Sequence, residues 1–93
     1  MELLIRVFTH PACAGCGPVV KMCWELAAAT NEIEIRTVKL ETKEGLAEAY
    51  LERIKTIPSV IVSRGGEELA RMVGTPTRES LEQAIRGVAT RSE

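Results

Sequence analysis

The stretch HPACAGCGPVV, residues 10–20, places Cys13 and Cys16 three positions apart, between a strand pattern and a helix pattern. The strand pattern before it, LLIRVFT at residues 3–9, is apolar and partly β-branched, with a single charge. The helix pattern after it covers residues 18–30 and confines its charges to one narrow stripe. A cysteine pair at such a junction has three interpretations: a working dithiol, part of a metal site, or two core residues.

The start of a helix favours the first interpretation. Its unpaired N–H groups and partial positive charge stabilise a thiolate, which makes a cysteine placed there a better nucleophile. The spacing predicts an exposed attacking thiol at Cys13 and a shielded resolving thiol at Cys16, close enough to form a disulfide. Pro18 leaves two helix starts open. A start at Cys13 would lose one helical hydrogen bond, whereas a start at Gly17 would put Pro18 at the favoured first position.

The other two interpretations have weaker support. A strand-to-helix junction after a proline is a poor place for core packing. His10 would give the pattern H-x-x-C-x-x-C, but no fourth ligand stands nearby, so we expect no bound metal. Cys23 lies seven residues after Cys16, about 10 Å along an unbroken helix, which is too far for a disulfide or a shared metal ion. We therefore interpret Cys23 as a small buried hydrophobic residue.

The composition is typical of one globular domain, which we expect to cover residues 1–93. A net charge of −1 and only three aromatic residues argue against binding to nucleic acid or to an anionic membrane. The opening MELLIRVFTH lacks the pattern of a signal peptide or a membrane span. We therefore expect a cytoplasmic monomer, and in the cytoplasm a C-x-x-C pair is more often redox-active or metal-binding than structural.

The remaining patterns complete the order β-α-β-α-β-β-α. Thr75 and Pro76 are expected to cap and begin the last helix, and the glycines of RGG to form a hairpin turn. A right-handed crossover makes the first two strands parallel, and the turn makes the last two antiparallel. These features predict an α/β protein with a four-stranded mixed sheet and helices on both faces. Further strands are expected at 33–40, 59–63 and 67–73, and further helices at 43–54 and 76–89.

Three motifs in order, CAGC at 13–16, TIPSV at 56–60 and GGEELARMVG at 65–74, carry a resemblance to the thioredoxin-like superfamily. The chain looks most like its compact, glutaredoxin-sized members, over residues 3–88. The resemblance implies a thiol–disulfide oxidoreductase that works without a cofactor. It implies disulfide-containing protein substrates, and a reductase or a small thiol as electron donor.

The resemblance also assigns roles to single residues. Cys13 matches the nucleophile and Cys16 the resolving thiol. Pro58 matches a cis-proline beside the pair, and Ile57 before it would offer backbone hydrogen bonds to a bound polypeptide or glutathione. Gly74 matches a glycine of the apolar surface around the site, and we add Ala12 to the residues expected to bind substrate.

Several positions depart from the family pattern. Ala12 stands where many thioredoxins carry tryptophan, and Ala14–Gly15 replaces the usual dipeptide. Val7 stands where typical thioredoxins have a carboxylate that assists proton transfer, and GTPT follows the last strand where glutaredoxins often bind glutathione. Two alternative functions therefore stay open, an Fe–S or zinc carrier and a non-catalytic redox sensor or adaptor. The direction of electron flow through the cysteine pair also stays open.

Overall fold

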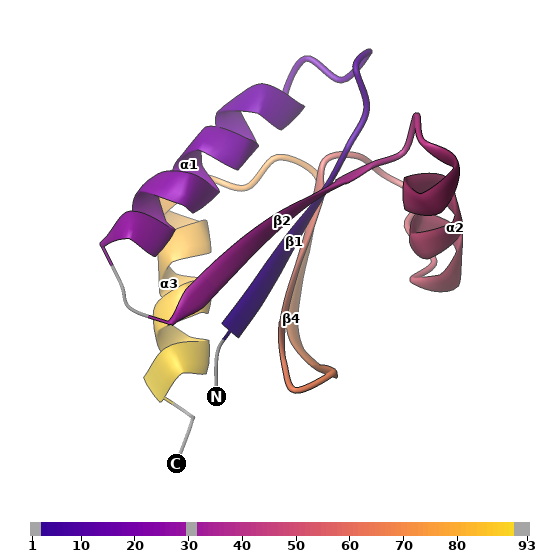
Figure 1. The fold of residues 1–93 in the computed structure, drawn as a ribbon. Helices are drawn as coiled ribbons and strands as arrows, with labels where there is room; N and C mark the ends of the chain where they lie inside the picture. Colours follow the sequence, from indigo (N-terminus) through magenta and orange to yellow (C-terminus); the bar gives the residue numbers. More distant parts are fainter. Residues whose placement is uncertain (1–2, 30–31, 91–93) are drawn as a thin grey trace.

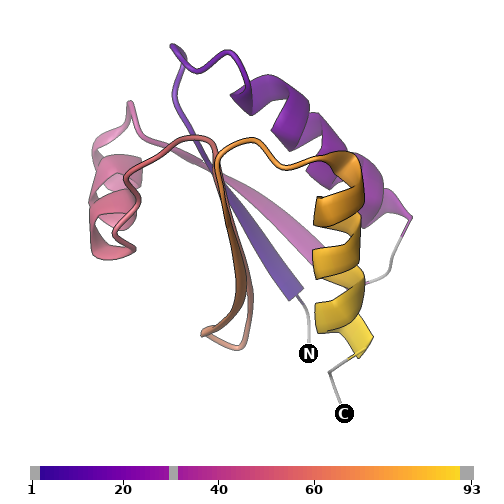
Figure 2. The ribbon, with the colours of Figure 1, turned by 180° about the vertical axis from the view of Figure 1, so that it is seen from behind.

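The computed structural model describes residues 3–29 and 32–90 (Figures 1 and 2). The predicted order β-α-β-α-β-β-α is confirmed. Its elements are β1 (Leu3–Thr9), α1 (Cys16–Ala28), β2 (Ile33–Lys39), α2 (Lys43–Leu51), β3 (Ser59–Arg64), β4 (Glu67–Val73) and α3 (Arg78–Thr90).

The four strands form one mixed sheet in the order β2-β1-β3-β4. β1 is parallel to β2 and antiparallel to β3, and β3 is antiparallel to β4. Figures 1 and 2 show α1 and α3 on one face of the sheet and α2 on the other. The prediction of a mixed sheet covered on both faces is thereby confirmed. The end of β1 lies beside the start of β3, because the two strands are antiparallel.

β1, one of the two inner strands, is buried on both faces, because its alternate side chains enter two separate hydrophobic clusters. Ile5 and Val7 belong to the larger cluster, which lies under α1 and α3. Phe8 belongs to a smaller cluster with Val38, Ala49 and Ile61, on the side of α2. Burial on both sides explains why this strand reads as an almost continuous apolar run.

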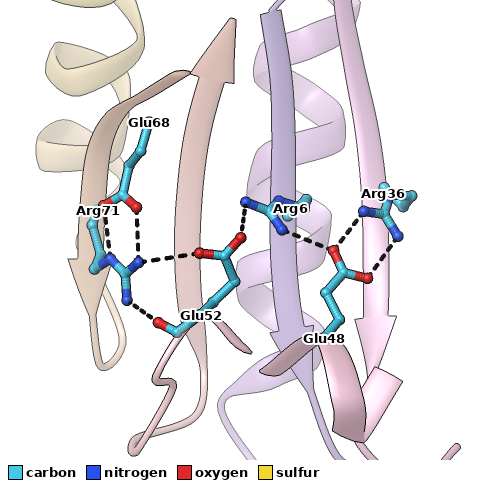
Figure 3. A network of polar contacts seen from close by, with 6 residues as sticks. All are labelled: Arg6, Arg36, Glu48, Glu52, Glu68 and Arg71. Atoms are coloured by element: carbon cyan, nitrogen blue, oxygen red, sulfur yellow. Dashed lines mark hydrogen bonds and ion pairs between the residues drawn. The ribbon is translucent and has the colours of Figure 1, made fainter. Parts of the chain in front are cut away.

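The face under α2 also holds six charged side chains, which come from three strands, from α2 and from Glu52 directly after it (Figure 3). Arg6 of β1 donates to Glu48 at 2.8 Å and lies 2.9 Å from Glu52, and its guanidinium also stands over the ring of Phe8. These contacts fasten α2 to the middle of the sheet. The chain of ion pairs runs in the order Arg36, Glu48, Arg6, Glu52, Arg71, Glu68.

This network predicts acid sensitivity. The pKa of Glu48 lies below its ordinary value of 4.5. The hydrogen bond from Arg36 is the main cause, and the hydrogen bond from Arg6 adds to it. A carboxylate with a lowered pKa stabilises the fold fully above its unfolded pKa, and this contribution is lost as the pH falls through the folded pKa. We expect the free energy of unfolding in urea to fall between pH 6 and pH 3, and to fall less in Glu48→Gln. An equal loss of unfolding free energy in the wild-type protein and in Glu48→Gln would show that Glu48 does not contribute to the acid sensitivity.

Several predicted helix boundaries are wrong. α1 begins at Cys16 instead of 18, and its predicted last residue, 30, lies outside the described residues. α2 ends at Leu51 instead of 54, because Arg53 takes a positive φ of 60° and the Ile54 N–H turns back to the Ala49 carbonyl. This is the hydrogen bonding that commonly terminates a helix, with arginine in the place usually taken by glycine.

The predicted start of the last helix at Thr75 and Pro76 is also wrong. The hydroxyl of Thr77 accepts the Ser80 N–H at 3.0 Å, and its carbonyl accepts the Leu81 N–H at 3.0 Å. Thr77 is therefore the N-cap, and Thr75 stays in the preceding loop. Among the described residues, no helix has the length and apolar character needed to cross a membrane.

Candidate active site

Cys13 and Cys16 are joined by a disulfide, with their Cα atoms 5.5 Å apart. Cys16 is the first residue of α1 and is only 4% exposed, whereas Cys13 lies in the turn before the helix and is half-buried. The difference in exposure is the one expected if Cys13 attacks a substrate and Cys16 resolves the product.

The start of α1 matches neither of the two starts that the sequence left open. The helix begins at Cys16, with Gly15 at the N-cap, so Pro18 is its third residue. The N–H groups of the first helical residues have no partner within the helix, and the missing N–H of Pro18 therefore removes no hydrogen bond. Cys13 stands just outside the N-terminus.

His10 organises the turn that leads to Cys13. Its carbonyl accepts the Cys13 N–H at 3.0 Å, and its ring Nδ1 accepts the Ala12 N–H at 3.1 Å. The second bond requires an unprotonated Nδ1, so a neutral ring carries its proton on Nε2. The sequence pattern indicates His10 only as a possible metal ligand, because nothing in it reveals a side chain folded back on its own turn. Among the described residues, no three His, Cys, Asp or Glu side chains form a group that could hold a metal ion.

The loop before β3 and the loop after β4 meet at the cysteine turn. The Ile57–Pro58 bond is cis, and the Pro58 carbonyl accepts the Gly74 N–H at 2.9 Å. Pro58 also lies next to Gly15, where an added Cβ would stand 3.9 Å from the Pro58 Cδ. The structure thus brings Pro58 and Gly74 together with the cysteine turn.

The two other predicted site residues are placed differently. Ile57 is half-buried against the cluster that contains Phe8 and Ile61. Its side chain is therefore partly in the core. Ala12 is exposed in the turn, and its amide is already used by His10.

A cavity of about 360 Å³ opens beside both cysteines, next to the ends of β1 and β2. Its charged lining residues are Lys39 and Glu41, neither of which belongs to a recognisable sequence motif. The parallel register explains the position of Lys39, because it pairs Thr9 of β1 with Lys39 of β2, and Glu41 follows in the loop after β2. The register between β1 and β2 would therefore be needed to place Lys39 at the cavity. A larger cavity of about 440 Å³ lies at the end of α2 and contains neither cysteine, so its size gives it no claim to be the site.

Cys23 is a fully buried member of the cluster under α1, together with Val7. Burial raises the pKa of its thiol to about 11. Its interpretation as a core residue is thereby supported by both position and chemistry, and it stands apart from the reactive pair.

Cys23 should therefore resist alkylation. In reduced native protein treated with iodoacetamide at pH 8, we expect mass spectrometry to find Cys13 modified and Cys23 free, because a buried neutral thiol is a poor nucleophile. In denaturant, Cys23 should react like an ordinary cysteine. Rapid modification of Cys23 in the native protein would contradict its assignment to the core.

The comparisons with known proteins follow this geometry. The family model described as Thioredoxin matches residues 2–87. The chain belongs to the thioredoxin family. Its membership, with the paired cysteines, supports thiol–disulfide oxidoreductase chemistry at the level of the family. Among curated proteins, none matches the chain.

Solved thioredoxin structures are similar to this family member in fold. Thioredoxin 1 of Thermosipho africanus has a TM-score of 0.83 at 18% identity, covering 96% of this chain and 97% of its own. Thioredoxin O2 of Arabidopsis thaliana in the oxidised state has 0.84 at 16% identity, covering 94% and 75%. Thioredoxin of Trypanosoma brucei brucei has 0.82 at 19% identity, covering 96% and 76%.

Proposed function

We propose that this thioredoxin-family protein reduces or exchanges disulfides of protein substrates through Cys13 and Cys16. The observation that carries the proposal is the disulfide between Cys13, in the turn, and the shielded Cys16 at the start of α1. The neighbouring Pro58 supports it, because it lies beside Gly15, between the two cysteines, and brings no charge to the pair.

The proposed reaction proceeds by two exchanges. The Cys13 thiolate attacks one sulfur of a substrate disulfide, forms a mixed disulfide, and releases the other sulfur as a thiolate that takes up a proton. Cys16 then loses its proton and attacks the Cys13 sulfur, which releases the second substrate thiol and leaves the Cys13–Cys16 disulfide. The substrate gains two electrons, and the protein loses two.

A reductase or a small thiol then restores the dithiol. We further propose that a substrate segment lies across the uncharged surface that Ala12, Ile57 and Gly74 form around the buried Pro58. With that uncharged surface, the substrate is held through backbone contacts and apolar packing. A cytoplasmic, monomeric protein fits this role.

The direct test is reduction of insulin disulfides with dithiothreitol as electron donor. We expect the wild-type protein to accelerate the reaction and Cys13→Ser to fall to the rate of dithiothreitol alone, because the attacking thiol is removed. Cys23→Ser is the matched control and should keep the wild-type rate. Full activity of Cys13→Ser would overturn the proposal.

A further inference from the structure

Gly15, between the two cysteines, has a backbone that does not require glycine. Its φ of −85° and ψ of −8° lie in a region open to ordinary residues, so alanine could adopt the same conformation. Space is the obstacle. A Cβ on Gly15 would stand only 2.8 Å from the Thr75 Oγ1, a separation that real Cβ atoms essentially never show. Its next neighbour, the Pro58 Cδ at 3.9 Å, is at an ordinary contact distance.

The backbone of Thr75 is held on both sides. On one side, Gly74 takes a φ of 87° and donates its N–H to the Pro58 carbonyl. On the other side, Thr77 caps α3. A clash with Gly15 therefore has to be relieved by the Thr75 side chain or by the cysteine turn. Threonine is branched at Cβ, which restricts the rotation that would clear the space.

We propose that Thr75 is a positioning residue of the dithiol, which restricts the residue before Cys16 to glycine and thereby sets the turn that closes the Cys13–Cys16 disulfide. The biological meaning of this inference rests on the proposed function. Its structural content concerns only the contact between the loop after β4 and the cysteine turn.

Because of this contact, we expect Gly15→Ala to shift the equilibrium between disulfide and dithiol in opposite directions with and without Thr75. In the disulfide form the covalent closure leaves the turn less room to shift than it has in the dithiol form. With Thr75 present, the added methyl group therefore penalises the disulfide more than the dithiol. Without Thr75, alanine only reduces the freedom of the open turn, which favours the disulfide.

The experiment compares wild type, Gly15→Ala, Thr75→Ala and the double variant in glutathione redox buffers, with the oxidised fraction measured by thiol trapping and mass spectrometry. We expect Gly15→Ala to shift the equilibrium toward the dithiol by about fivefold, a coupling typical of residues in contact. The double variant should return to the wild-type value or move beyond it toward the disulfide. Gly15→Ala/Thr75→Val is the matched control, and because valine keeps the bulk it should retain the shift.

Two results would overturn the inference. One is an equal shift by Gly15→Ala in the presence and absence of Thr75. The other is an unchanged equilibrium together with an equal loss of unfolding free energy in both redox forms, which would show a merely structural contact. If Gly15→Ala does not fold, the double variant must fold, and failure of both would also contradict the inference.

Failure of the proposed function can be distinguished from failure of the inference about Thr75. Protein that shows this coupling but does not reduce insulin would refute the function alone. Active protein without the coupling would refute the role of Thr75 alone.

Discussion

Replacing Cys16 with serine should stop the reaction at the mixed disulfide. Cys13 lies outside α1 and keeps its access to substrate, so the first attack remains possible. The resolving thiol is gone, and serine cannot take its place because it forms no disulfide. We expect Cys16→Ser to accumulate a covalent adduct with insulin or another disulfide-containing protein. Mass spectrometry should detect this mixed disulfide, and dithiothreitol should cleave it.

The matched variants make this prediction specific. Cys13→Ser should form no adduct, since the remaining thiol at position 16 is shielded. Cys16→Ser/Cys23→Ser should still form it, because Cys23 is buried in the core. An adduct through Cys23 would show that Cys13 is not the attacking thiol. Multiple turnovers by Cys16→Ser would show that Cys16 is not the resolving thiol.

Replacing Glu48 with glutamine should lower the free energy of unfolding by about 2 kcal/mol, the largest effect on stability that we predict. Glu48 accepts from Arg36 and from Arg6, whose side chain is only 12% exposed (Figure 3). Removing the charge leaves Arg6 on the sheet face with Glu52 alone. This remaining partner and the partial exposure of Glu48 keep the loss below that of a fully buried broken pair.

Chemical unfolding at pH 7 measures this loss, and the chain offers a control. Glu82 pairs with Arg86 one turn away on the exposed side of α3. Glu82→Gln should cost about 0.5 kcal/mol or less, as exposed helical pairs do. Equal losses for Glu48→Gln and Glu82→Gln would contradict the view that the network fastens α2 to the sheet.

The fold could be predicted because its strong patterns are local. The apolar run at residues 3–9 and the alternation at 33–40 identify strands without any tertiary information. The helix ends could not be predicted, because distant contacts choose between equivalent local signals. Thr75 and Thr77 both suit a helix cap, and the hydrogen bond between Gly74 and Pro58 keeps the first of them in the loop.

The candidate site shows the same division. Cys13, Cys16 and Pro58 could be recognised from their order along the chain. Thr75 and Lys39 could not, because their places depend on how separate segments meet in space. The six-residue charge network was missed as well, although Arg6 inside an otherwise apolar strand was a signal that a partner must lie across it.

The most direct test of the central claim is a single turnover of the reduced protein on an excess of a disulfide substrate, quenched with acid and analysed by mass spectrometry. We predict one Cys13–Cys16 disulfide for each substrate disulfide reduced, with Cys23 still a free thiol. Substrate reduction without that disulfide, or no reaction by the intact dithiol, would contradict the claim that Cys13 and Cys16 form a working redox pair.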